Sequence, residues 1–301
     1  MTFRVTDGFS NARLVAQITA GRQRISAAQE RVASGKRINR PSDDPVGAGT
    51  VVRLRSSETA IAQFERNAGA ANDTLLAADN ALEAYETTLD RARALLTQGA
   101  SDSTSAEGKK DIAVELDHLF AQTLGLANQE FGDRFLFGGT RQAAPPYDSN
   151  AVPAATPATQ QLLQLDPDAA PVATGVLAES AFADATGTVF TELQNAATAL
   201  RGTGDPVADK AAVLTSLDRL TVLSEQARTA HALIGNGLER VQAITDQLGQ
   251  RSLVLAQAAD RTEGADFAEA ALELTSSQQA LDAILQTRAV TNRRTLLDLL
   301  G

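Results

Sequence analysis

The chain has 301 residues, 43% of them hydrophobic, and its 37 Asp and Glu outnumber its 27 Lys and Arg to give a net charge of −10. The apolar content favours a folded chain with a sizeable core, while the acidic excess argues against a nucleic-acid partner. Cysteine is absent, which excludes disulfides, thiolate metal sites and a cysteine nucleophile.

The N-terminal end differs in charge from the rest of the chain. Residues 1–66 hold eleven Lys or Arg against six Asp or Glu, which fits either attraction between subunits or solvated helix faces without a partner. The first ten residues include Arg4 and Asp7, so they lack the apolar run of a secretory signal, and no later stretch reaches the roughly 18 apolar residues of a membrane span. We therefore expect no membrane span, and a chain that is cytoplasmic or exported by an unusual route.

Two long helices are predicted in the first third of the chain, over 9–34 and 46–98. In both, apolar or small residues recur at the spacing of helices that pack on other helices. The first stripe is Leu14, Ile18, Gly21, Ile25, Ala28 and Val32, and the second is Leu54, Ile61, Ala68, Leu75, Leu82, Leu89 and Leu96. Ser34-Gly35 predicts a helix stop, and Asp44 before Pro45 predicts a capped helix start.

A third helix is predicted over 105–131, where the apolar residues fit the helical spacing more loosely, with Thr104 and Glu107 as a candidate capping box. The segment that follows has a different composition. Six of the nine prolines lie between residues 141 and 200, which excludes a long helix there. We expect an inserted domain or extended loop with short strands near Gln161–Leu165 and Thr188–Phe190.

Two further helices are predicted over 206–261 and 267–299, started by Asp205 before Pro206 and by Asp266. The predicted fold is mainly α: long antiparallel helices from both chain ends form a coiled-coil or bundle rod around a small middle domain that is a candidate for β structure. Because a fully buried Leu or Ile gains roughly 1.5–3 kcal/mol, an uncovered stripe is a binding surface. Within the chain, each terminal helix has mainly the other as a packing partner, so we expect other subunits to complete the burial of their apolar stripes. An ordinary intramolecular helix bundle is the alternative.

No set of residues is typical of an enzyme. The two histidines, His118 and His231, lie 113 positions apart, and no glycine-rich segment has the full pattern of a phosphate-binding loop. Asp43-Asp44 could bind a cation or transfer protons, but a carboxylate beside a proline is more simply a helix cap. We predict no catalytic residue, no cofactor and no metal.

Residues 31–45, which read Arg-Val-Ala-Ser-Gly-Lys-Arg-Ile-Asn-Arg-Pro-Ser-Asp-Asp-Pro, resemble the N-terminal signature of the bacterial flagellin family, as do residues 66–72. Residues 262–269 and the helix after them are similar to the family's C-terminal region, so the resemblance covers roughly 1–140 and 205–301. The signature positions are Ser34, Gly35, Ile38, Asn39, Pro41, Ser42, Asp43, Asp44, Pro45, Asn67 and Asn72. Within the family, Pro-Ser-Asp-Asp-Pro and the run Asn-Gln-Glu-Phe-Gly-Asp-Arg-Phe are most similar to hook-associated proteins of the hook-filament junction.

The resemblance implies a structural subunit that acts as an adaptor at that junction. Residues 1–44 and 258–301 would pair as an inner terminal domain, 45–140 and 205–257 would form a helical rod, and 141–204 would face outward. Assembly would use apolar residues of the terminal helices, namely Leu14, Ile18, Ile25, Val32, Phe267, Leu274, Leu281, Leu285, Leu296, Leu299 and Leu300. A filament-forming flagellin, or an unrelated intracellular coiled-coil scaffold, is the alternative.

The resemblance also implies partners and a location. The partners would be copies of the same chain in a ring, the adjacent hook-associated protein and flagellin, and an export chaperone. The location would be extracellular, in the flagellum, after export by flagellar type III secretion without a cleaved signal peptide.

Overall fold

The computed structural model describes residues 3–141 and 144–300, with side chains described over 12–141 and 144–287. It divides into two compact units, one formed by Met1–Ile61 with Arg251–Gly301 and the other by Ala62–Gln250. The helices are α1 (Phe3–Ser34), α2 (Pro45–Gly99), α3 (Ala106–Ala127), α4 (Ala178–Phe182), α5 (Val189–Arg201), α6 (Pro206–Glu263) and α7 (Phe267–Leu300). Short antiparallel hairpins join β1 (Glu130–Phe131) to β2 (Arg134–Phe135), β3 (Leu162–Leu163) to β4 (Val172–Ala173), and β5 (Ala183–Asp184) to β6 (Gly187–Thr188). The predicted mainly α fold with long antiparallel helices is confirmed.

Capping residues start three of the long helices where the sequence predicted. The carboxylate of Asp44 accepts a hydrogen bond from the Gly47 amide at 2.9 Å, and Asp205 accepts one from Val207 at 3.0 Å. Asp266 caps α7 in the same way. Each carboxylate satisfies an amide that has no partner inside the helix, so these boundaries are fixed by local chemistry.

The start of α3 differs from the prediction. Ser105, and not Thr104, is the cap, because its hydroxyl accepts from the Gly108 amide at 3.1 Å. The Thr104 hydroxyl instead donates to the carbonyl of Gln98 at the end of α2. The predicted Thr104–Glu107 capping box is therefore wrong, and α3 ends at Ala127, short of the predicted residue 131, where β1 has begun.

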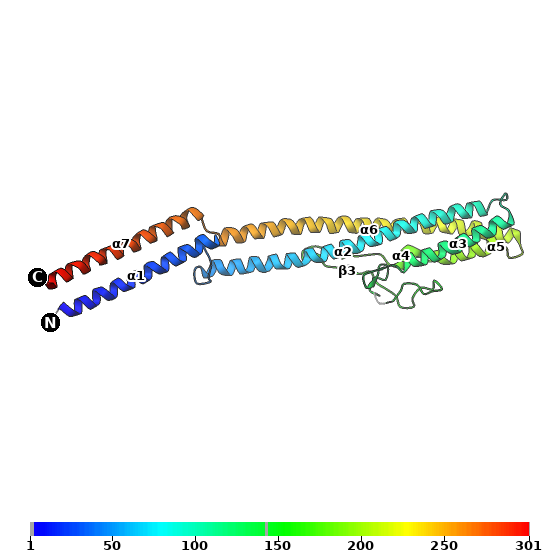
Figure 1. Ribbon diagram of the computed structural model, residues 1–301. Helices are drawn as coiled ribbons and strands as arrows, with labels where there is room; N and C mark the ends of the chain where they lie inside the picture. The colour runs from blue at the N-terminus through cyan, green and yellow to red at the C-terminus, as the bar shows by residue number, and fades with distance from the viewer. Residues whose placement is uncertain (1–2, 142–143, 301) are drawn as a thin grey trace. The chain divides into compact units, whose positions relative to one another are not determined.

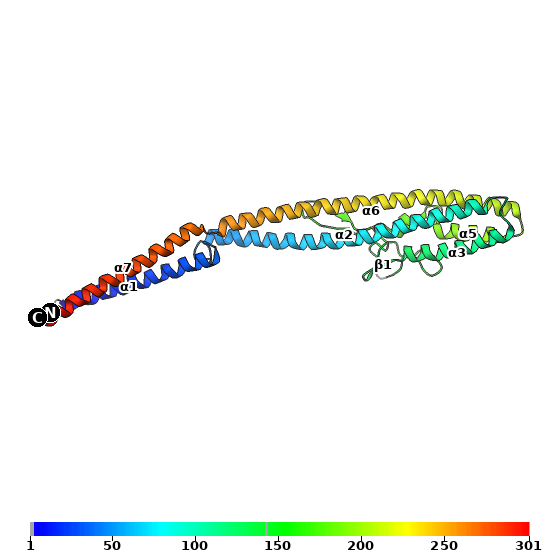
Figure 2. The same cartoon turned by 45° about the horizontal axis from the view of Figure 1, so that its top comes forward.

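In the first unit, α1 and α7 lie side by side (Figures 1 and 2). They are antiparallel: Gly21 faces Leu281, and further along α1 the Arg31 guanidinium lies 2.6 Å from the Glu273 carboxylate of α7. A Cβ placed on Gly21 would lie 3.3 Å from Leu281 Cδ1, so the small residue lets the two helices approach closely.

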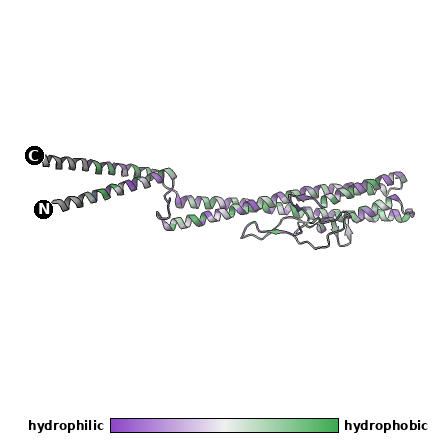
Figure 3. Cartoon of the chain, turned by 60° about the horizontal axis from the view of Figure 1, so that its bottom comes forward, coloured by the Kyte–Doolittle hydropathy of each residue, from purple (hydrophilic) through white to green (hydrophobic). Residues whose placement is uncertain are grey.

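In the second unit, α2 and α6 lie side by side (Figures 1 and 2), and most of the predicted α2 stripe is buried. The buried α2 residues are Ala68, Leu75, Leu82, Leu89 and Leu96, and those of α6 include Leu220, Ala227, Ile234, Val241 and Leu248. Hydrophobic and hydrophilic residues are interleaved along these helices (Figure 3), as expected where only one face is covered. The first two positions of the predicted α2 stripe, Leu54 and Ile61, are half-buried and belong to the first unit.

The middle segment contains short strands, as predicted, and also two helices, α4 and α5, that the sequence pattern did not suggest. Only Thr188 of the expected strand Thr188–Phe190 is in a strand, because its hydroxyl caps α5 by accepting from Thr191. α5 packs along α3 and buries Phe190 in an aromatic cluster. That cluster joins Tyr85 of α2 to Phe137, Tyr147, Phe182 and Phe190. The buried aromatics anchor the middle segment to the helices.

Candidate assembly site

The turn between α1 and α2 begins at a glycine that its conformation requires. Gly35 has φ +67°, and its amide donates to the Arg31 carbonyl at 2.9 Å. Such a φ is the left-handed region that glycine adopts without steric cost, so Gly35 ends α1 as the sequence predicted. The Ser34 hydroxyl donates back to Glu30 and accepts from the amide of Lys36, which adds a second anchor.

Asp43 holds the centre of this turn. One of its carboxylate oxygens accepts from the Asn39 amide at 3.1 Å and from the Arg40 amide at 2.9 Å. Its own amide donates back to the Arg40 carbonyl. Pro41 and Ser42 lie exposed at the tip. The Asp43 carboxylate thus closes the turn by accepting hydrogen bonds from two backbone amides in place of a backbone carbonyl.

Asp44 links the turn to the start of α2. The Gly47 amide and the Arg37 guanidinium donate to its two oxygens, and these interactions lower the pKa of Asp44 although partial burial opposes them. Beside it, Ile38 is buried against Gly47, where an added Cβ would lie only 2.6 Å from Ile38 Cδ1. Both aspartates are engaged in caps and turns, which supports the capping interpretation of Asp43-Asp44. Within the described residues, no cluster of three or more potential metal ligands occurs.

A second turn, between α6 and α7, lies against the first. Lys36 and Gly264 form an antiparallel bridge, and the Ala265 amide donates to the Gly35 carbonyl at 2.9 Å. A Cβ on Gly264 would lie 2.5 Å from the Asp260 carbonyl oxygen, so only glycine fits there without displacement. Segments more than 220 positions apart in sequence are therefore joined through their backbones.

Glu263 is the side chain that ties the two turns together. It accepts from the Arg55 guanidinium at 2.6 Å and forms an ion pair with Lys36 at 3.2 Å. Burial disfavours the charged carboxylate, but the bonds from Arg55 and Lys36 outweigh burial and lower the pKa of Glu263. The Arg37 amide also donates to the Glu263 carbonyl.

The predicted assembly residues lie on α1 and α7, and the packing of these two helices buries their side chains only in part. Among those with described side chains, the half-buried ones are Leu14, Ile18, Ile25, Val32, Leu274 and Leu281, and the exposed ones are Phe267 (66%) and Leu285 (41%). Leu296, Leu299 and Leu300 belong to α7, but their side chains lie outside the described residues. Val15 and Leu272, which the sequence analysis did not select, are 53% and 71% exposed. The α1–α7 pair thus presents more apolar surface than the stripes indicated.

The other signature residues do not join the turn. Asn67 and Asn72 are half-buried on α2 in the second unit, where Asn67 accepts a hydrogen bond from Gln63. The signature therefore combines one compact turn with two separate helix positions.

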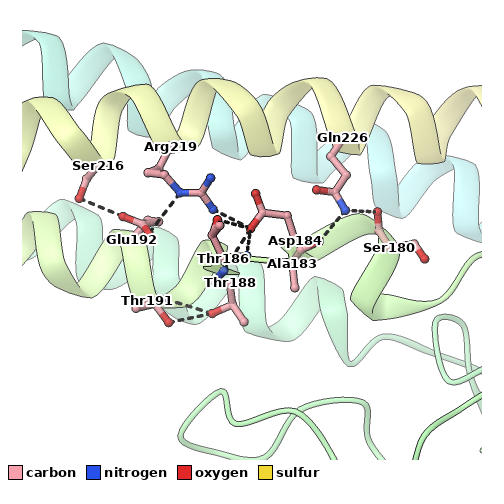
Figure 4. Close-up of polar contacts among 11 residues, drawn as sticks. Ser180, Ala183, Asp184, Thr186, Thr188, Thr191, Glu192, Ser216, Arg219 and Gln226 are labelled. Atoms are coloured by element: carbon pink, nitrogen blue, oxygen red, sulfur yellow. Dashed lines mark hydrogen bonds and ion pairs between the residues drawn. The ribbon is translucent and has the colours of Figure 1, made fainter.

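The second unit contains a polar cluster that sequence patterns did not reveal (Figure 4). Arg219 of α6 lies between Asp184 of the β5–β6 hairpin at 2.7 Å and Glu192 of α5 at 3.7 Å. The Ser216 hydroxyl donates to Glu192 at 3.2 Å. Hydrogen bonds from Arg219 and Thr186 hold the pKa of Asp184 well below its usual range. The cluster fastens the hairpin and α5 to α6, and every side chain in it is engaged by another.

His231 of α6 contacts two acidic residues of α2. Its Nδ1 lies 2.9 Å from Glu86 Oε1, and its Nε2 lies 3.0 Å from Asp79 Oδ1. His231 therefore bridges α6 to α2. His118 is exposed on α3.

Comparison with known proteins relates this architecture to flagellar proteins. Residues 9–142 match the bacterial flagellin N-terminal helical region. Flagellin of Listeria monocytogenes is 26% identical over 258 residues, which cover 83% of this chain and 82% of that protein. Flagellar hook-associated protein 3 of Salmonella typhimurium is 26% identical over 120 residues, 40% of this chain and 38% of that protein.

Solved structures give the same result at the level of the fold. A putative flagellar hook-associated protein from Vibrio parahaemolyticus has a TM-score of 0.68 at 17% identity, covering 74% of this chain and 100% of that one. FlgL of Xanthomonas campestris has a TM-score of 0.62 at 18% identity, covering 69% and 99%.

These findings relate the chain to flagellar proteins in sequence over residues 9–142 and in fold. The chain carries the flagellin N-terminal helical region, and solved hook-associated proteins share its fold, so the resemblance predicted from the signature is confirmed. Over residues 3–141 and 144–300, no helix has the length and hydropathy needed to cross a membrane.

Proposed function

We propose that this chain is a structural subunit of the bacterial flagellum, without enzymatic activity, that acts as an adaptor at the hook-filament junction. The observation that carries the proposal is the α1–α7 pair, whose larger apolar side chains, over the described residues, are half-buried or exposed. A two-helix pair has no third element to complete its core, so further subunits are needed to cover it.

The energy available from covering these faces supports assembly. Fully burying one Leu, Ile or Phe gains roughly 1.5–3 kcal/mol. The eight predicted assembly residues with described side chains are all incompletely buried. Completing their burial would yield on the order of several kcal/mol per subunit, enough to offset part of the ordering cost of docking.

The position within the flagellum rests on fold likeness. The hook-associated proteins of Vibrio parahaemolyticus and Xanthomonas campestris are matched over nearly their whole chains, which favours the junction. The longer sequence match to Listeria flagellin, over 83% of this chain, favours a filament subunit as the second candidate.

The same proposal extends to organisation, partners and route. Residues 1–44 and 258–301 form the inner terminal domain, 45–140 and 205–257 form the rod, and 141–204 face outward. The partners are copies of this chain in a ring, a neighbouring hook-associated protein, flagellin, and a chaperone during export. Export proceeds through the flagellar type III apparatus without removal of an N-terminal signal, which places the assembled chain outside the cell.

Deletion of the gene in its own bacterium tests the proposal. Loss of a junction adaptor leaves hooks in place while flagellin leaks into the medium, as electron microscopy and analysis of the medium would detect. Loss of filament material with no flagellin in the medium would identify a filament subunit instead. A motile deletion strain with normal filaments would refute both.

Limited proteolysis of the free chain separates a flagellar subunit from an intracellular scaffold. We expect the first and last forty or so residues to be cleaved quickly, while 46–257 resists, because the terminal helices lack their covering subunits. Complete protection of both ends in a monomer would contradict assembly through them.

A further inference from the structure

The second unit contains a cavity between α2 and two of the short hairpins. Its volume is about 390 Å³, and it is lined by Ala70, Ala71 and Thr74 of α2, by the β1–β2 hairpin and by the β3–β4 hairpin with the residues beside it. Small-molecule sites in proteins occupy roughly 300–1,000 Å³, so the cavity has the size of a ligand site. All of its lining residues belong to Ala62–Gln250, so the terminal helices take no part in it.

The inner surface of the cavity is largely apolar. Leu136 and Val176 are buried there, Phe135 and Leu163 are half-buried, and Phe131 is 44% exposed. These side chains come from both hairpins, so an apolar group inside the cavity would be covered from two sides. Such burial favours a ligand that has an apolar part of its own.

Two charges of opposite sign line the cavity from different elements. Asp73 of α2 is exposed, and its carboxylate forms no hydrogen bond or ion pair with any other described residue. Arg134 of β2 has only the adjacent Asp133 as an ionic partner, at 3.7 Å, which is longer than a hydrogen bond. Both the Asp73 carboxylate and the Arg134 guanidinium are therefore available to a ligand.

We propose that this cavity binds a free amino acid with a large apolar side chain. The guanidinium of Arg134 donates hydrogen bonds to the ligand carboxylate, a pairing in which two parallel bonds can form. The Asp73 carboxylate accepts from the ligand ammonium, and the apolar side chain of the ligand lies among the leucine and phenylalanine side chains of the hairpins. This site is separate from the proposed assembly function and does not depend on it.

The two charges select a zwitterion over simpler ligands. An amine without a carboxylate would leave Arg134 without a ligand partner, and a carboxylic acid without an amine would leave Asp73 without one. The interior of a peptide chain carries neither charge on its backbone. A free amino acid offers both charges together with the apolar side chain that the cavity can cover.

Titration of the full chain with three matched probes tests the site. The probes are L-phenylalanine, 2-phenylethylamine, which lacks the carboxylate, and 3-phenylpropionate, which lacks the ammonium. Saturation-transfer NMR of their ring protons reports binding. We expect a dissociation constant of about 1 mM or below for phenylalanine, and one about tenfold higher or more for each of the other two. Equal binding of all three probes would overturn zwitterion recognition, and so would no binding of phenylalanine at about 20 mM.

Variants of the two charged residues assign each charge to its partner. Asp73→Asn should weaken phenylalanine binding about tenfold and leave 3-phenylpropionate unchanged, whereas Arg134→Gln should weaken phenylalanine and leave 2-phenylethylamine unchanged. A residue that only shaped the cavity would weaken all three probes. Asp111→Asn and Arg228→Gln, at exposed positions of the same unit that do not line the cavity, are the matched controls and should change nothing.

Filling the cavity gives an independent measurement. Ala70 is exposed on α2 and lines the cavity, so Ala70→Leu should abolish binding of phenylalanine without unfolding the helix. Tyrosine fluorescence during urea unfolding checks that the second unit remains folded, because both tyrosines lie in it. Undiminished binding by a folded Ala70→Leu chain would place the ligand elsewhere and overturn the site. None of these failures would affect the proposed role at the junction, which rests on the terminal helices.

Discussion

Replacing His231 by glutamine tests the bridge between α6 and α2. A neutral imidazole has one N–H, so ionised Glu86 and Asp79 can both accept hydrogen bonds only from the protonated ring. Burial opposes that charge, but the hydrogen bonds and charges of the two carboxylates outweigh it and raise the pKa of His231 above its usual value. Glutamine keeps a polar side chain of similar length but cannot carry the charge.

The sign and size of the effect follow from this geometry. Since the folded pKa is raised, the stabilisation is complete below the unfolded value of about 6.5 and is lost as pH rises through the folded pKa. The His231 side chain is 29% exposed, so each bond is discounted to about 1 kcal/mol. We expect His231→Gln to lower the free energy of unfolding by about 1–2 kcal/mol near pH 6 and by little near pH 9.

The assay can be confined to the unit that contains the bridge. The chain has no tryptophan, and its two tyrosines, Tyr85 and Tyr147, are both buried in the second unit. Tyrosine fluorescence during urea unfolding therefore follows that unit alone. Exposed His118→Gln is the matched control and should have no effect at either pH. Equal destabilisation by His231→Gln at both pH values would refute the charged bridge.

Three further outcomes are expected. Gly264→Ala should speed backbone hydrogen exchange in the α6–α7 turn, because its Cβ would lie 2.5 Å from a carbonyl oxygen, whereas Gly249→Ala, with open space around it, should not. Burial raises the pKa of Tyr85 and Tyr147, so the folded chain should show no tyrosinate absorbance at about pH 11, where the urea-unfolded chain does; absorbance in both would contradict their burial. Leu281→Asp should impair assembly while tyrosine-monitored unfolding stays unchanged, and equal loss of both would place the ends in the main core.

Features governed by neighbouring residues could be predicted from the sequence. The starts of α2 and α6 followed from Asp44 and Asp205 before prolines, because a cap involves atoms only two or three positions apart. The buried face of α2 followed from its seven-residue repeat, since a helix places Leu75 and Leu82 on one side whatever covers them.

Features that depend on distant partners could not be predicted in this way. α5 lies in a proline-rich, alanine-rich stretch, and its burial depends on α3, which it packs along. Arg219 pairs with residues 27 and 35 positions away, and His231 with residues 145 and 152 positions away. No local pattern marks such pairs, because their geometry exists only once the helices have packed.

The contact between the two turns explains how one short signature influences the pairing of both terminal helices. The bridge between Lys36 and Gly264 fixes which residues of α1 and α7 stand opposite each other, and the helices then continue in antiparallel register through Arg31–Glu273 to Gly21–Leu281. A slip at the bridge would move every one of these pairs. The signature residues around Gly35 thus act beyond their own turn: by setting this register, they determine which side chains of α1 and α7 pack against each other along the helix pair.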